Sequence, residues 1–289
     1  MKMIQSPGMF AGFVARAKSL RIKPKRRKTR LNAHKFFPWG AELEARNLIR
    51  SELEATAETL MAEALKGVSL HDDNSDLNGI GSDVPLSFSS SAEKIASDIE
   101  KFQTQAFSNF SELTIGSRYI PPVTSASQSI KSAWKQNFIT LCKSANEEMK
   151  KKISISISNA VMQGKGLKET EIEIRKINPD FSKGKADLIA RTETAKLNSA
   201  IARAQSLSVG IDYYEWGAAM DERTRPSHSA MNGLICKWDD PDGYYTYENG
   251  TTVRHLRTTL MFHGAPGEDY NCRCTALPWI PELADSYSV

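Results

Sequence analysis

The sequence lacks the long apolar run of a membrane-spanning helix, because no stretch approaches the roughly 20 hydrophobic residues needed to cross a bilayer. Its N-terminal segment has a short apolar patch but neither a hydrophobic core nor a small-residue cleavage site, so we expect no signal peptide. It contains no internal repeat. We therefore expect no membrane partner and a protein that acts in the cytoplasm of the cell that makes it, or in a particle assembled there.

Cysteine is scarce, with four residues in a chain of 289. In a reducing compartment such cysteines are expected to be thiols or metal ligands rather than disulfides. Cys272 and Cys274 are separated by one residue, and a disulfide between them would close a small, strained ring. The pair is therefore expected to remain as thiols or to share a metal ion.

Acidic residues are absent from the start of the chain, where the first is Glu42. Eleven Lys and Arg residues precede it, and subtracting them from the total of 38 leaves 27 basic against 34 acidic residues, a net charge of −7. A cationic arm on a mildly acidic body suits a polyanion, most simply duplex DNA. The predicted DNA-binding residues are Lys23, Lys25, Arg26, Arg27, Lys28 and Arg30.

Apolar residues at helical spacing predict most of the remaining structure. Expected helices cover 41–66, a second segment that starts at a capping box of Ser90 and Glu93, and 130–149 with a continuation to Met162. A Gly-, Ser- and Asp-rich linker is expected over 67–90. Two further helices are expected over 168–177, ending before Pro179, and over 185–208, capped by Gly210.

The composition changes after Gly210, where Asp212–Met220 predicts a strand and the rest is rich in Gly, Pro, Asp and Tyr. Short strands at most are expected there. The fold class is therefore predicted as α+β, with mostly helical N-terminal and central parts and a small irregular α+β C-terminal end. The predicted divisions are a basic flexible arm over 1–40, a helical region over 41–124 and a C-terminal module over 125–289.

An ordered set of motifs in this C-terminal module resembles the phage Mu protein F-like family of head-morphogenesis proteins. The matching pieces are Gln163–Leu167, Ile189–Ala195, Tyr214–Trp216, Asp221–His228, Asn232–Gly233, Trp238–Pro241, Gly264–Gly267 and Asn271–Cys274. Each piece alone is weak, but their common order and spacing are specific. The resemblance covers about residues 125–280.

The resemblance implies a minor capsid protein of a tailed bacteriophage. It implies a position inside the procapsid near the portal, assembly in the host cytoplasm, and a role in head assembly and in DNA retention or delivery. The implied partners are the portal protein, a scaffold or major capsid protein, and phage double-stranded DNA. The implied function is structural, so no catalytic residue is assigned.

A polar cluster is predicted from the Arg-Thr-Glu position and the turn around Pro226, namely Arg191, Thr192, Glu193, Asp221, Arg225 and His228. In the structural interpretation, the cluster clamps the C-terminal end and Arg191 pairs with a carboxylate such as Asp221. In the alternative, the Arg-Thr-Glu residues form a solvated helix face. A different class of function, a hydrolase or transferase acting on nucleic acid or a nucleotide, would use Arg191, Glu193 and His228 for acid–base chemistry.

A structural zinc ion is a hypothesis for the C-terminal end, which is poor in long apolar stretches and would gain stability from a cross-link. The candidate ligands are His228, Cys236, Cys272 and Cys274, which form a Cys₃His set. Asp221 or His263 could replace Cys236. The metal-free alternative has His228 hydrogen-bonded and the cysteines as small buried residues.

Overall fold

The structure is a computed structural model that describes residues 8, 10–12, 14, 15, 36–69, 86–163, 165 and 167–284. All six predicted DNA-binding residues and most of the predicted linker lie outside the described residues. The described part of the chain contains no helix with the length and apolar character needed to cross a membrane.

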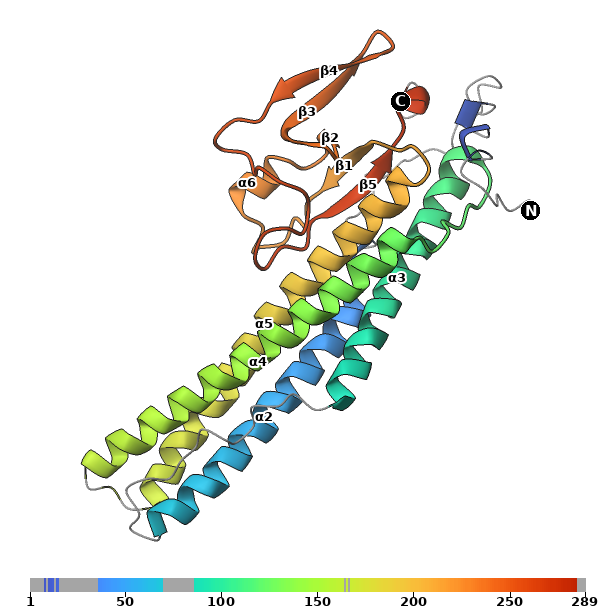
Figure 1. Cartoon of the computed structure of the whole chain (residues 1–289). Helices are drawn as coiled ribbons and strands as arrows, with labels where there is room; N and C mark the ends of the chain where they lie inside the picture. The colour runs from blue at the N-terminus through green and yellow to red at the C-terminus, as the bar shows by residue number, and fades with distance from the viewer. Residues whose placement is uncertain are drawn as a thin grey trace. The chain divides into compact units, whose positions relative to one another are not determined.

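Long helices and one antiparallel sheet make up most of the described chain (Figure 1). The helices are α2 (Trp39–Ser69), α3 (Leu86–Ile115), α4 (Ser125–Met162) and α5 (Leu167–Leu207). The C-terminal part contains β1 (Tyr213–Gly217), α6 (Pro226–Ser229), β2 (Ile235–Lys237), β3 (Asp240–Glu248), β4 (Thr251–Leu256), β5 (Thr275–Trp279) and the 3-10 turn η3 (Pro281–Leu283). The predicted α+β class is confirmed.

The chain forms two compact units from interleaved segments. Unit 1 comprises Met1–Trp39, Ser97–Ser132 and Thr194–Val289, and unit 2 comprises Gly40–Ala96 and Ala133–Glu193. Helices α3, α4 and α5 each contribute to both units. The predicted modules 1–40, 41–124 and 125–289 divide the chain in sequence order instead, and they stay predictions.

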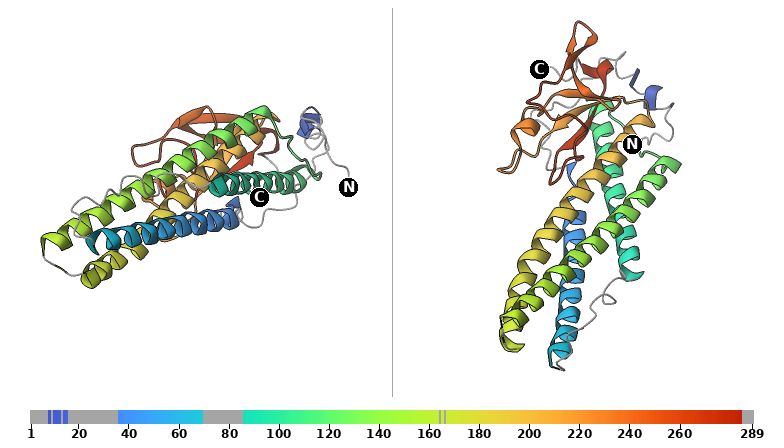
Figure 2. Two further views of the ribbon diagram at one scale, coloured as in Figure 1. Left: turned by 60° about the horizontal axis from the view of Figure 1, so that its bottom comes forward. Right: turned by 60° about the vertical axis from the view of Figure 1, so that its left-hand side comes forward.

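Unit 2 is a bundle of helical segments, which lie side by side in both views of Figure 2. Its interior contains the apolar stripe predicted on α2, at Ile49, Leu53, Ala57 and Leu60, all buried. Phe138 of α4 stacks on Phe88 of α3 and on Trp134, at ring-centroid distances of 5.7 and 4.8 Å. Burial of such stripes stabilises the helices, since each large apolar side chain contributes about 1.5–3 kcal/mol.

Helix α3 begins four residues before the predicted capping box, so the prediction that Ser90 caps it is wrong. Burial of Phe88 against Phe138 stabilises this extra turn, which lies in the segment predicted to be a linker. Helix α4 continues through Ile153 and Ile157, which are buried, and this confirms the helical interpretation of that alternating segment.

Helix α5 runs without a break from Leu167 to Leu207, so the predicted stop before Pro179 is wrong. Proline inside a helix removes one hydrogen-bond donor and costs about 3 kcal/mol. Pro179 itself is exposed, while Ile174 before it and Ala186 after it are buried. Packing before and after Pro179 offsets the free-energy cost of the proline. A local sequence pattern does not show the size of this packing contribution.

The end of α5 follows its predicted cap. Gly210 has φ +78°, and the Ile211 N–H donates to the Ser206 carbonyl at 2.9 Å, which is the six-to-one bond of a Schellman motif. Ile211 then enters an apolar cluster of unit 1 together with Phe107, Phe110, Tyr119, Val209, Ile280 and Leu283. The cap therefore directs the chain from the end of α5 into this apolar cluster.

The C-terminal part is a five-stranded antiparallel sheet in the order β4-β3-β2-β1-β5 (Figure 1). The strand predicted over 212–220 is confirmed as β1. The expectation of short strands at most is wrong, because β3 has nine residues and pairs with β4 from Gly243↔Leu256 to Glu248↔Thr251. The two-residue turn of this hairpin is Asn249-Gly250, with φ values of +51° and +84°. Asn-Gly is the strongest short-range hairpin signal, and it was available in the sequence.

Candidate metal centre

His228 is placed by a tight corner between β1 and β2. Helix α6 begins with Pro226, whose fixed φ suits the first helical position, and places His228 two residues later. The His228 side chain is only 3% exposed. Trp216 and Phe262 lie against its ring, at centroid distances of 6.0 and 4.6 Å. The ring is therefore held in a largely apolar surrounding.

The turn ahead of this corner is stabilised by Asp221, one of the predicted cluster residues. Its carboxylate accepts hydrogen bonds from the Arg223 N–H at 3.1 Å and from the Thr224 hydroxyl at 2.9 Å. It also lies 3.8 Å from the Arg273 guanidinium. Asp221 is thus part of the framework that positions α6.

Cys272 and Cys274 lie just before β5, at the end of a loop that packs on α5. Gly267 in this loop has φ +86°, and a Cβ built on it would lie 2.5 Å from the Ala195 carbonyl oxygen. Both conditions require glycine. Asn271 also has positive φ, at +57°, and turns the chain so that both cysteines become buried.

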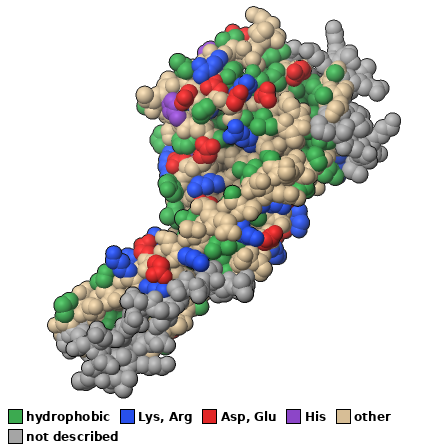
Figure 3. All heavy atoms as spheres, in the orientation of Figure 1, with side chains coloured by type: hydrophobic (Ala, Val, Ile, Leu, Met, Phe, Trp, Pro, Cys, Tyr) green, Lys and Arg blue, Asp and Glu red, His purple; other side chains and the backbone are tan. Residues whose placement is uncertain are grey.

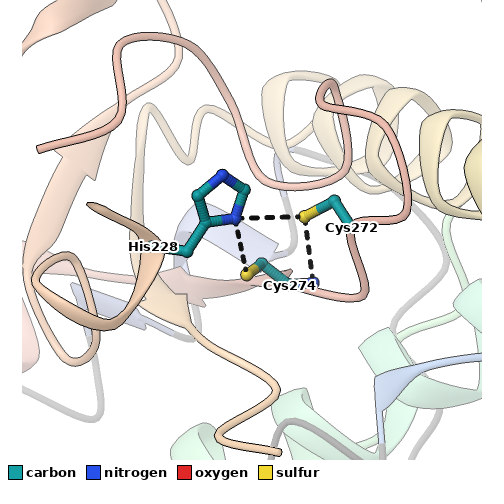
Figure 4. A group of neighbouring side chains, drawn as sticks. All are labelled: His228, Cys272 and Cys274. Atoms are coloured by element: carbon teal, nitrogen blue, oxygen red, sulfur yellow. Dashed lines mark hydrogen bonds between the residues drawn. The ribbon is translucent and has the colours of Figure 1, made fainter. Parts of the chain in front are cut away.

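The structure brings His228, Cys272 and Cys274 into one buried group (Figure 4). The His228 Nδ1 atom lies 3.5 Å from Cys272 Sγ and 3.4 Å from Cys274 Sγ. The Cys274 N–H donates to Cys272 Sγ at 3.3 Å. Three potential metal-ligand atoms therefore converge within 4.8 Å of one another.

The other ring nitrogen of His228 faces Asp269, whose Oδ2 lies 3.2 Å from Nε2. Arg225 donates to the same carboxylate oxygen at 2.8 Å and to the Tyr270 carbonyl at 2.9 Å. Because a carboxylate accepts, the His228 Nε2 carries the proton and Nδ1 presents its lone pair to the two sulfurs. Asp269 was not among the predicted site residues, and no spacing signal in the sequence points to it.

The pKa values of Cys272 and Cys274 are shifted by their mutual contact, whereas those of Cys142 and Cys236 are shifted mainly by burial. A hydrogen bond from the Cys274 side chain, followed by contributions from His228 and the Cys274 N–H, lowers the pKa of Cys272. The same pairing with Cys272, and then burial, raises the pKa of Cys274. Burial raises the pKa of Cys142 and of Cys236, which favours inert thiols there.

Cys236 does not join this group. Its Sγ lies 3.9 Å from the Leu234 carbonyl oxygen, and the electrostatic neighbours of its thiol are Arg257 and Tyr214. His263 is also elsewhere, since its Nδ1 lies 2.8 Å from Asp242. The structure thus unites three of the four proposed ligands and separates Cys236 from them.

The Arg-Thr-Glu residues lie in unit 2, where Arg191, Thr192 and Glu193 are all buried. The alternative of a solvated helix face is therefore wrong. The Trp134 indole N–H donates to the Glu193 carbonyl, and the Asn137 amide donates to its carboxylate, both at 2.9 Å. Arg191 Nε lies 3.9 Å from Glu42. The predicted pairing of Arg191 with Asp221 would join the two units and stays a prediction.

Comparison with known proteins finds a similarity over the part of the chain that contains this arrangement. Residues 151–277 match the family described as Phage Mu protein F like protein. The match includes every residue of the His228, Cys272 and Cys274 group, as well as the buried Arg191, Thr192 and Glu193. The predicted resemblance is confirmed.

Two curated proteins are similar to parts of this chain. The chain is 29% identical to minor head protein GP7 of Bacillus phage SPP1 over 133 residues, which cover 45% of this chain and 41% of that protein. It is 30% identical over 140 residues to an uncharacterized protein of Haemophilus influenzae strain Rd, covering 48% and 27% of the two chains. The matches therefore span well under half of each relative. No solved structure matches the chain.

Proposed function

We propose that this chain is a minor head protein of a tailed bacteriophage, acting in head morphogenesis. The observation that carries the proposal is the family match over residues 151–277, together with similarity to a protein named a minor head protein. We further propose that it sits inside the capsid near the portal and contacts the packaged DNA. The basic arm supports the DNA contact, because it concentrates eleven cationic residues before the first carboxylate.

The geometry favours a structural role over the hydrolase or transferase alternative. That alternative requires His228 to exchange protons with a substrate, but one of its nitrogens faces two buried sulfurs and the other faces Asp269. It also requires free Glu193 oxygens, whereas this carboxylate accepts from Asn137 inside a helical unit. These contacts support positioning rather than turnover.

The proposal is tested in the phage or prophage that encodes the chain. We expect an amber mutation in the gene to lower the yield of infectious particles, and mass spectrometry of purified heads to detect the protein at far fewer copies than the major capsid protein. Cross-linking of procapsids should join it to the portal. Heads that contain none of the protein would contradict the proposal, and cross-links confined to the outer shell would contradict the portal position.

A further inference from the structure

We propose that unit 1 binds one zinc ion through His228 Nδ1, Cys272 Sγ and Cys274 Sγ, and that Asp269 holds the imidazole in the orientation that this requires. The proposal concerns a site independent of the arm and of portal binding. It rests on distances, on the hydrogen-bonding capacity of the ring and on the place of the three residues in the fold.

The distances match a tetrahedral zinc site. Zinc bonds of about 2.05 Å to imidazole nitrogen and about 2.3 Å to thiolate sulfur, at tetrahedral angles, place the nitrogen about 3.5 Å from each sulfur. The observed separations between Nδ1 and the two Sγ atoms are 3.5 and 3.4 Å. One ion placed between the three atoms would satisfy both of these separations.

Without a metal ion, only one of the two thiols can donate its hydrogen bond to the imidazole. Because Nε2 donates to Asp269, the neutral ring offers only one lone pair, at Nδ1, to two neighbouring thiols. A cation would accept that lone pair and one from each thiolate together. A carboxylate on the remote nitrogen of a ligating histidine is the usual outer-sphere partner, because it fixes the tautomer and increases ligand basicity.

The ligand types select the metal. Thiolate and imidazole favour zinc over calcium or magnesium, which prefer oxygen ligands. The backbone supports thiolates here, since the Cys274 N–H donates to Cys272 Sγ. All three side chains are only 3–4% exposed, which favours a structural cross-link over access for a substrate.

The place of the ligands explains what a cross-link would stabilise. His228 belongs to the corner before β2, whereas the two cysteines lead into β5, 44 and 46 residues later. The intervening chain forms the β3–β4 hairpin and the loop to Gly267. A single ion would therefore tie the two ends of this long excursion to each other. Restraint of a long loop stabilises a fold through the unfolded state.

The site is tested on the purified full-length chain, produced in zinc-supplemented medium and analysed for metal by mass spectrometry. We expect about one zinc per chain in the wild type, and its loss in Cys272→Ser, Cys274→Ser and His228→Gln. The matched control is Cys236→Ser, a buried cysteine that faces Leu234 and should keep the zinc. In competition with a chelator, Asp269→Ala should bind zinc about 10- to 100-fold more weakly.

Two outcomes would overturn the proposal. One is less than about one-tenth equivalent of zinc in the wild type, together with a melting temperature that a chelator does not change. The other is equal zinc loss in Cys236→Ser and Cys272→Ser, which would refute the ligand set. If the ligand variants fail to fold, thiol alkylation of the wild type tests the site instead. Zinc should protect Cys272 and Cys274 from alkylation until a chelator is added. Equal alkylation with and without chelator would refute the site.

Discussion

Gly267 shows how one residue fixes the loop that carries the two cysteines. Its φ of +86° is unfavourable for any side chain, and its Cα approaches the α5 backbone so closely that a Cβ would meet the Ala195 carbonyl oxygen. Gly250, in the β3–β4 turn, has nearly the same φ but open space around it. The two positions therefore separate backbone strain from steric clash.

We predict that Gly267→Ala destabilises the protein by about 2–5 kcal/mol, because it adds a clash of about 1–3 kcal/mol to a left-handed strain of about 1–2 kcal/mol. Gly250→Ala should cost only the strain. Urea unfolding followed by tryptophan fluorescence measures both free energies of unfolding. Equal losses in the two variants would show that the loop moves away from α5 at no cost, contrary to the tight packing described.

At the scale of elements, the β3–β4 hairpin is held at its open end by a side-chain network. Arg254 of β4 donates to both carboxylate oxygens of Asp240, at 2.6 and 2.8 Å, and the Tyr245 hydroxyl donates to one of them at 2.8 Å. The hydrogen bonds from Arg254 lower the pKa of Asp240 to about 2. The charged carboxylate is thus favoured in the folded hairpin.

This shift predicts a stability difference that depends on pH. The pKa of Asp240 is about 2 in the folded protein and 3.8 in the unfolded chain. The ionised carboxylate therefore stabilises the fold fully at pH values above 3.8, and this contribution is lost as the pH falls to about 2. Arg254→Met should therefore lower the melting temperature at pH 7 and have a much smaller effect near pH 2. Arg203→Met, on the exposed side of α5, is the control and should have little effect at any pH. A loss from Arg254→Met that is constant across this range would contradict the ionic explanation.

Helix α5 illustrates the limit of local patterns at the same scale. Proline and glycine at positions 179 and 184 indicate a break, yet the helix continues because burial before and after them outweighs the local penalty. The Arg-Thr-Glu segment lies farther along this continuous helix, where its side chains are buried and Glu193 accepts a hydrogen bond from Asn137.

At the scale of the whole molecule, the basic residues are concentrated near the start of the sequence, in the segment predicted to be an arm. The chain has eleven basic residues before Glu42 and a net charge of −7 after removal of those eleven. On the face shown in Figure 3, the basic and acidic side chains of the described residues are interspersed rather than separated by sign. An anionic polymer would therefore find its densest positive charge in the arm.

We predict DNA binding that is independent of sequence and falls steeply with salt, at a slope of log affinity against log salt near −0.9 for each neutralised phosphate. Deletion of residues 1–31 should remove most of the affinity and flatten the slope. A variant with Gln at Lys143, Lys151 and Lys176, which are exposed on the body, should change both much less. Filter binding or fluorescence anisotropy at several salt concentrations measures the slope. Affinity unchanged by the deletion would favour an acidic protein surface as the partner of the arm.

The sequence alone was enough to predict most of the helices, the end of α5 and the family resemblance. Apolar periodicity located most of the helices, and Gly210 marked the end of α5. The order of motifs around His228 and Asn271–Cys274 indicated the family whose model matches residues 151–277. These features depend on short stretches of chain, whose spacing and backbone preferences are visible in the residues themselves. The Asn249-Gly250 turn belongs with them, since its signal was present even though the long hairpin was not predicted.

Only the tertiary structure decided which side chains meet. Cys272 and Cys274 meet His228 because the corner at α6 and the loop before β5 converge. Cys236 lies on the central strand β2, and its Sγ lies near the Leu234 carbonyl oxygen. Asp269 reaches His228 across 41 residues of sequence. The physical reason is that such contacts depend on sheet order and loop packing, which are set by the burial of the whole chain and leave no periodic trace in the sequence around any one ligand.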